Sequence, residues 1–128
     1  MKERDLQSRV IRAALPVVPR SSSIEVKVSK GDSISYSATK EHQIRALYLS
    51  TTEIGMGFKI PDCGFQNPFD IFILKKACAY KALVFNLGIR GKNECVLVSL
   101  EKWTQEKERS TRKSITLTRA KQIGTLLW

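Results

Sequence analysis

The stretch Ile24-Glu25-Val26-Lys27-Val28 alternates apolar and charged residues and predicts a half-buried β-strand. Side chains of a strand point alternately to its two faces, so the three apolar residues share one face while Glu25 and Lys27 share the other. Carboxylate oxygens are the ligands that Mg²⁺ prefers, and a neighbouring lysine can orient a bound water or neutralise charge on a phosphate. The same tripeptide also fits an exposed strand face with an ordinary ion pair, so the strand alone leaves both interpretations open.

Helical periodicity is expected on both sides of this strand. Residues 2–14 predict an amphipathic helix with Leu6, Val10 and Ala13 or Ala14 as its apolar stripe. Residues 38–52 predict a second helix, with Ser37 or Thr39 as its N-cap and an apolar face of Ile44, Leu47 and Tyr48. The last helix is expected to start at Thr116.

Three further strands are predicted downstream, over Pro68–Leu74, Ala82–Leu87 and Cys95–Leu100. The last two are nearly continuous apolar runs, so both should be covered on two faces. Residues 101–113 are polar and basic and predict a solvated connection with Trp103 as its anchor. This order of elements predicts one α/β domain over residues 1–128, with a mixed sheet flanked by helices.

Positive charge is concentrated at the two ends of the chain, which has a net charge of +10. Residues 1–30 carry seven Lys/Arg against three acids and residues 101–128 seven against three, whereas residues 31–100 carry eight against six. Two basic ends on a compact domain indicate a polyanionic partner, with nucleic acid first, and solubility alone is the alternative. The sequence shows no apolar run long enough for a bilayer and no secretion signal, so no membrane association is expected.

The cysteines do not indicate a metal site. Cys63, Cys78 and Cys95 form no Cys-x-x-Cys pair, and His42 is the one histidine, so a zinc site is not expected. We therefore expect reduced, mostly buried thiols in a cytoplasmic protein.

Other residues are candidates for a site around Glu25. Glu3 continues the inward-facing stripe of the first helix, although an acid in a first turn also simply complements the helix dipole. Gln43 stands at the edge of the second helix's apolar face, where it either reaches into a site or caps the core. Asp70 opens an apolar strand, where a carboxylate is costly unless a partner or a metal holds it. Asp62 fits a turn better.

Several blocks of the sequence together resemble a known family. They are Ile24-Glu25-Val26-Lys27, Ser33-Ile34-Ser35-Tyr36-Ser37, Glu41-His42-Gln43-Ile44 and Arg112-Lys113-Ser114-Ile115. With these blocks the chain resembles the Holliday junction resolvases of the RecU type, in the PD-(D/E)XK nuclease superfamily. Lys59-Ile60-Pro61-Asp62 and Pro68-Phe69-Asp70 resemble blocks of short phage or mobile-element relatives, and the likeness covers most of residues 3–124.

The resemblance implies a restriction-endonuclease-like core, dependence on Mg²⁺ with Mn²⁺ as a substitute, a homodimer, and nicking of four-way DNA junctions. Carried over to this chain, Glu25 would ligate the metal and Lys27 would serve the attacking water. Glu3 matches the extra acid that many resolvases place on the first helix. Gln43 matches the glutamine of the helix after the Glu-x-Lys strand.

One part of the family pattern has no counterpart, because the superfamily's aspartate normally precedes the Glu-x-Lys strand and no acid lies between Asp5 and Glu25. One alternative is that Asp70 supplies the acid, so that Glu25, Asp70 and Glu3 hold the metal. The other is a catalytically weakened protein that serves as a DNA-binding module. A sequence-specific restriction enzyme is a third alternative, but so short a chain shows no recognition subdomain.

DNA backbones would be held by the basic first helix and by the basic C-terminal region. The residues expected to bind nucleic acid are Arg4, Arg9, Arg12, Arg112 and Lys113. Such phosphate contacts are independent of sequence and weaken with salt.

Overall fold

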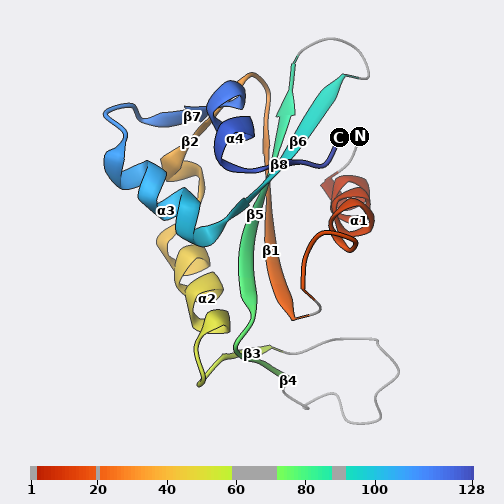
Figure 1. Cartoon of the computed structure of the whole chain (residues 1–128), viewed down its shortest axis with the longest axis vertical. Coiled ribbons are helices and arrows are strands. Elements are labelled where there is room, and N and C mark those ends of the chain that lie inside the picture. Colours follow the sequence, from red (N-terminus) through yellow and green to blue (C-terminus); the bar gives the residue numbers. More distant parts are fainter. Residues whose placement is uncertain (1–2, 20, 59–71, 88–91) are drawn as a thin grey trace.

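The computed structural model describes residues 3–19, 21–58, 72–87 and 92–128. Its centre is a four-stranded sheet in the order β1-β5-β6-β8 (Figure 1). β1 (Ser22–Ser29) pairs in parallel with β5 (Cys78–Asn86), while β6 (Asn93–Ser99) and β8 (Thr125–Leu126) extend the sheet in antiparallel pairs. The mixed α/β sheet expected from the sequence is therefore confirmed.

Helices cover both faces of this sheet. α1 (Glu3–Ala14) lies over one face, on the right in Figure 1. α2 (Glu41–Thr51), α3 (Leu100–Arg109) and α4 (Leu117–Ile123) lie over the other face. The buried character of β5 and β6 on both faces follows from this double cover.

The core between α1 and the sheet is a cluster of apolar side chains. Leu6, Val10 and Ala14 are the buried residues among the described side chains of the helix, and the first two pack against Ala82 and Val84 of β5. Their spacing of four residues places them on one side of the helix, as the sequence predicts.

The opposite face has a core of large side chains centred on Trp103, which is 1% exposed. Leu83 and Phe85 reach it from β5, and the ring of Tyr36 packs against Trp103 with centroids 5.1 Å apart. Aromatic pairs at this separation stabilise a core beyond their buried area. This face therefore gains a rigid aromatic centre.

Short strands complete the fold. β2 (Ser33–Ser35) pairs with β7 (Ser114–Thr116), and β3 (Met56–Phe58) pairs with β4 (Phe72–Leu74), both antiparallel. A 3₁₀ turn over Tyr36–Ala38 follows β2. The β2–β7 pair joins the segment after β1 to the segment after α3.

The prediction of a solvated connection over residues 101–113 is wrong, since most of it belongs to α3. Ser99 caps this helix by accepting a hydrogen bond from the Lys102 amide at 3.3 Å. Leu100 and Trp103 are its buried residues, too few to give a visible helical period in a charged stretch. Trp103 itself is the anchor that the sequence predicts.

The second helix starts later than predicted. Lys40, rather than Ser37 or Thr39, occupies the N-cap position, because the 3₁₀ turn takes up the preceding residues. Leu47 is buried as expected, but Tyr48 is 62% exposed and does not face the core.

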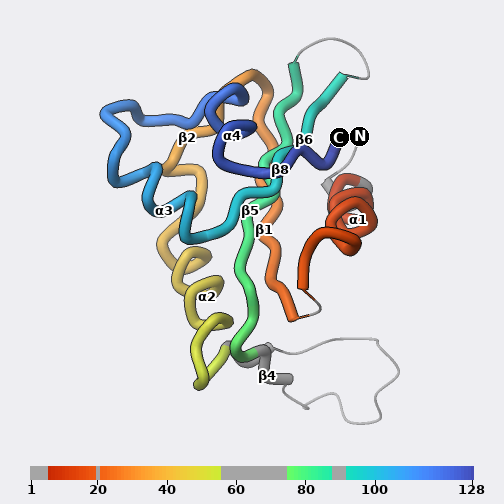
Figure 2. The backbone as a smooth tube through the Cα atoms, viewed as in Figure 1, coloured from red at the N-terminus to blue at the C-terminus, as the bar shows by residue number. Residues whose placement is uncertain are grey.

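The last helix agrees with its predicted start. Thr116 caps α4 by accepting a hydrogen bond from the Arg119 amide at 3.2 Å. The chain then returns along the sheet as β8 to the α1 side (Figure 2), where the Arg9 guanidinium lies 4.1 Å from the ring centroid of Trp128.

Two remaining expectations concern the thiols and the membrane. Cys95 is a buried free thiol, whereas Cys78 is exposed against expectation, and Cys63 lies outside the described residues. Within the described parts of the chain, no helix is both long and apolar enough to cross a bilayer.

Candidate functional site

A cleft of about 410 Å³ runs across β1 from α1 to α2. In the described residues β1 pairs only with β5, so its other side is the open edge of the sheet. The cleft exists because α1 and α2 cover opposite faces and leave this edge between them. It is lined by Gln7, Val10, Ile11, Ile24, Glu25, Val26, Lys27 and Gln43.

Three predicted site residues come together in this cleft. The Lys27 ammonium lies 3.2 Å from a carboxylate oxygen of Glu25, and these side chains are 22% and 14% exposed. Lys27 also donates a hydrogen bond of 3.1 Å to the side-chain oxygen of Gln43. Strand alternation puts the first two residues on the α2 face, and the start of α2 brings the third onto it.

Gln43 reaches into the cleft, which is one of the two alternatives that the sequence leaves open, and it also caps the start of α2. Its side-chain oxygen accepts the Lys27 bond and also a 3.2 Å bond from the backbone amide of Lys40, the N-cap of α2. The capping bond holds the glutamine at the helix start, and the glutamine then holds Lys27.

Lys81 of β5 joins the cluster, although sequence reasoning missed it. It is the register partner of Glu25, and its ammonium lies 3.5 Å from the second Glu25 oxygen. The side chain is fully buried, donates to the Thr39 hydroxyl and lies over the Trp103 ring at 4.3 Å from its centroid. The visible signal was a lysine in the middle of the apolar run of β5, where a charge needs a partner.

Burial lowers the pKa of Lys81 to about 8, and the nearby Glu25 carboxylate partly opposes this effect. Lys27 and Lys107 add repulsion in the same direction as burial. The shift reflects the cost of holding an ammonium in the sheet interior.

The Glu25 carboxylate is held by charge rather than by hydrogen bonds. Both its oxygens are buried, and neither accepts a hydrogen bond of good geometry from the described residues, although two ammonium groups lie within 3.5 Å. One carboxylate and two ammonium groups give the cluster a net charge of +1. Such a cluster favours an anion unless further acids join it.

Among the described residues of the cleft, one can ligate Mg²⁺. Glu25 has the required oxygen chemistry and unbonded lone pairs, and the described residues contain no group of three or more His, Cys, Asp or Glu that could hold an ion. Further ligands would come from Asp70, Asp62 or Glu3. Asp70 and Asp62 lie outside the described residues. The backbone of Glu3 lies in α1, one turn before the cleft residue Gln7, and its side chain is not among those described.

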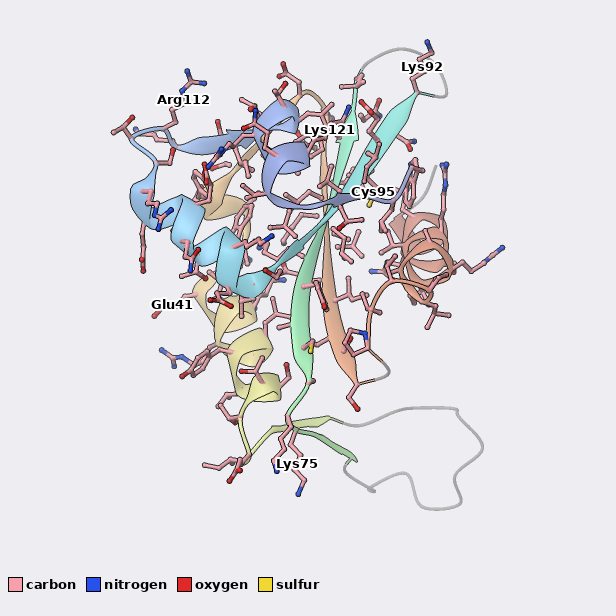
Figure 3. The ribbon with its side chains drawn as sticks, viewed as in Figure 1. Glu41, Lys75, Lys92, Cys95, Arg112 and Lys121 are labelled. Carbon is pink, nitrogen blue, oxygen red and sulfur yellow. The ribbon has the colours of Figure 1, made fainter. Side chains whose placement is uncertain are left out.

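The expected nucleic-acid residues lie on different sides of the molecule and form no single patch among the described side chains. Arg9 and Arg12 are exposed on α1, over one face of the sheet. Arg112 and Lys113 belong to the turn between α3 and β7, on the opposite face, where Figure 3 shows Arg112 projecting from the periphery. Arg4 lies in α1, and its side chain is outside the described part.

Comparison with known proteins adds no relative. The chain matches no protein-family model, no curated protein and no solved structure. The proposed function therefore rests on the chain's own residues and geometry and on the resemblance of its sequence blocks.

Proposed function

We propose that this protein is a Mg²⁺-dependent, structure-selective DNA endonuclease that nicks branched DNA, as the resemblance to junction resolvases implies. The observation that carries the proposal is the meeting of Glu25, Lys27 and Gln43 in one cleft. The three residues come from two elements, and they are the ones to which the resemblance assigns a metal ligand, a water-handling lysine and a glutamine.

Lys27 has the geometry to handle a phosphate or a water. An ammonium has three donors, and Lys27 directs one of them to Gln43 while it lies 3.2 Å from a Glu25 oxygen. Donor capacity is therefore left for a phosphate oxygen or for the attacking water in the cleft. A divalent ion held by Glu25 would polarise the phosphate and lower the pKa of a bound water.

The order of the elements supports a restriction-endonuclease-like core of reduced size. After α1 come the Glu-x-Lys strand β1, the crossover helix α2 and β5, which pairs in parallel with β1. Only residues 15–21 connect α1 to β1, too few for the hairpin that normally carries the aspartate. The missing acid would therefore approach the open edge of β1 from elsewhere, and Asp70 is the first candidate.

A non-catalytic DNA-binding module is the second candidate. The net charge of +1 at Glu25, Lys27 and Lys81 favours it, because both carboxylate oxygens already face ammonium groups. In that case the cleft would bind a backbone phosphate without hydrolysing it.

We further propose a homodimer, because paired nicks in a four-way junction need two sites related by symmetry.

Cys78 and Cys95 are free thiols, which supports a reducing compartment and hence the cytoplasm.

The deciding experiment incubates the protein with end-labelled duplex, single-stranded, flap and four-way DNA, with Mg²⁺, with Mn²⁺ and with chelator. Metal-dependent nicks in the branched substrates, lost in Lys27→Ala, are expected. Tight DNA binding without any cleavage would favour the binding module instead.

A further inference from the structure

A second pocket, remote from β1, is lined by arginine and hydroxyl side chains. Its volume is about 310 Å³, and its walls are the end of α3, the following turn, β7 and the first turn of α4. Arg109, Arg112 and Arg119 line it together with one acid, Glu106. Four serine and threonine residues also line it.

One of the three arginines is already neutralised. Arg119 makes two hydrogen bonds to the two oxygens of Glu106, at 2.8 and 3.0 Å. These bonds are the main cause of the lowered pKa of Glu106, so the carboxylate stays ionised and paired. Three positive charges and one negative charge leave the pocket with a net charge of +2, carried by Arg109 and Arg112.

The pocket is built on rigid structure. Tyr36 contributes to its lining, is only 5% exposed, and packs against Trp103. The turn that carries Arg112 is fixed by Ser110, whose hydroxyl accepts a 3.0 Å hydrogen bond from the Arg112 amide. A preformed site loses less ordering free energy on binding than a mobile one does.

We propose that this pocket binds a backbone phosphate of nucleic acid, with Arg109 and Arg112 as its cations. Guanidinium groups match phosphate oxygens with paired hydrogen bonds, and hydroxyl side chains are common donors to the sugar-phosphate backbone. The inference rests on the proposed function only in taking nucleic acid as the partner, and it does not depend on cleavage.

This phosphate would be a different one from the phosphate at Glu25. Lys81 of the Glu25 cluster lies over one side of Trp103, and Tyr36 of the pocket packs against the same ring. Both side chains thus lie near the same buried tryptophan, but the pocket and the cleft at Glu25 have no lining residue in common. A strand held in the pocket would be anchored away from the site of hydrolysis.

The test measures binding of a fluorescein-labelled 12-nucleotide single-stranded DNA and its RNA counterpart by anisotropy, in chelator so that no cleavage occurs. Arg112→Ala and Arg109→Ala should each weaken binding of both about tenfold and lower the salt slope by about one. Arg45→Ala is the matched control, because it removes an exposed arginine on α2, outside the pocket. It should change affinity by less than about twofold.

Two further measurements distinguish binding in this pocket from a general attraction of nucleic acid to the positively charged surface. Arg112→Lys keeps the charge but not the paired donors, so it should restore little of the lost affinity. Inorganic phosphate and a nucleoside 5′-monophosphate, each balanced with chloride at constant ionic strength, should displace the labelled strand from the wild type more than from Arg112→Ala. Full rescue by lysine, or an equal loss in Arg45→Ala, would overturn the proposal. A wild type that binds as predicted but cuts no DNA would refute the nuclease proposal and leave this one standing.

Discussion

The Glu25 carboxylate and the Lys81 ammonium lie 3.5 Å apart across the parallel β1–β5 pair, in which the two residues are register partners. A fully buried lysine in a central strand is costly, and removing one partner of a buried ion pair leaves the other unpaired. The candidate site is therefore tied to the interior of the sheet through this pair.

Lys81 should make stability depend on pH. Its folded pKa of about 8 lies below the ordinary 10.5 of lysine, so between these values the unfolded chain binds more protons than the folded chain does. Stability of the wild type relative to Lys81→Met should thus rise from pH 8 to 10, by up to about 3 kcal/mol. Urea melts of both proteins at several pH values measure this difference.

The titration of Cys95 does not affect this comparison. Burial raises its pKa from 9.0 to about 12, so its contribution to stability falls as pH rises above 9. This opposite slope is present in both proteins and cancels in the difference. A flat difference between wild type and Lys81→Met would show that Lys81 has an ordinary pKa.

Glu25→Gln should abolish cleavage and weaken the fold without weakening DNA binding. The change removes the negative charge between Lys27 and Lys81, so the two ammonium groups repel each other without compensation. We expect a loss of about 3 kcal/mol in the free energy of unfolding and unchanged or tighter DNA binding. Urea melts and anisotropy in chelator measure the two effects. Glu41→Gln, on an exposed acid of α2, is the control and should leave stability and cleavage nearly unchanged.

Asp70→Asn should abolish Mg²⁺-dependent cleavage as fully as Lys27→Ala, with DNA binding retained. The expectation follows from the cost of an unpaired carboxylate at the start of the apolar strand that the sequence predicts over Pro68–Leu74, a cost that a shared ion would remove. Asp62→Asn should have a much smaller effect. Nicking of four-way DNA measures both variants. Full activity of Asp70→Asn would move the missing acid to Glu3 or Asp62, with Glu3→Gln as the next variant.

Trp103→Phe should cost less than about 1 kcal/mol, whereas Trp103→Ala should cost about 3–5 kcal/mol. The indole nitrogen is buried and has no hydrogen-bond partner in the described part of the chain, so phenylalanine removes an unsatisfied donor and keeps most of the packing. Thermal unfolding of the two variants measures both losses of stability. A large loss in Trp103→Phe would reveal a bond to the indole nitrogen.

The proposed homodimer should be visible by light scattering at micromolar concentration. A resolvase places two sites at opposed strands, so dimerisation and paired nicking should be lost together on dilution. A monomer that still makes paired nicks would contradict this expectation.

Local sequence was sufficient for the elements with a strong period. The alternation of residues 24–28 predicts β1 and its two faces, and the spacing of Leu6, Val10 and Ala14 predicts α1 and the face that it buries. Glu25 and Lys27 could be grouped beforehand because strand alternation puts them on one face, whereas only the family resemblance grouped Gln43 with them. By contrast, α3 has two buried residues, and so weak a period could not distinguish it from a loop.

Tertiary structure alone decided what the candidate site contains beyond those three residues. The register of β1 against β5 puts Lys81 beside Glu25, and strands so far apart in the chain are paired by packing rather than by local preference. The placement of α1 opposite α3 likewise separates Arg12 from Arg112, although both belong to basic stretches of the sequence. Composition records how many charges a chain carries, whereas the pairing of strands and the packing of helices determine which charges meet.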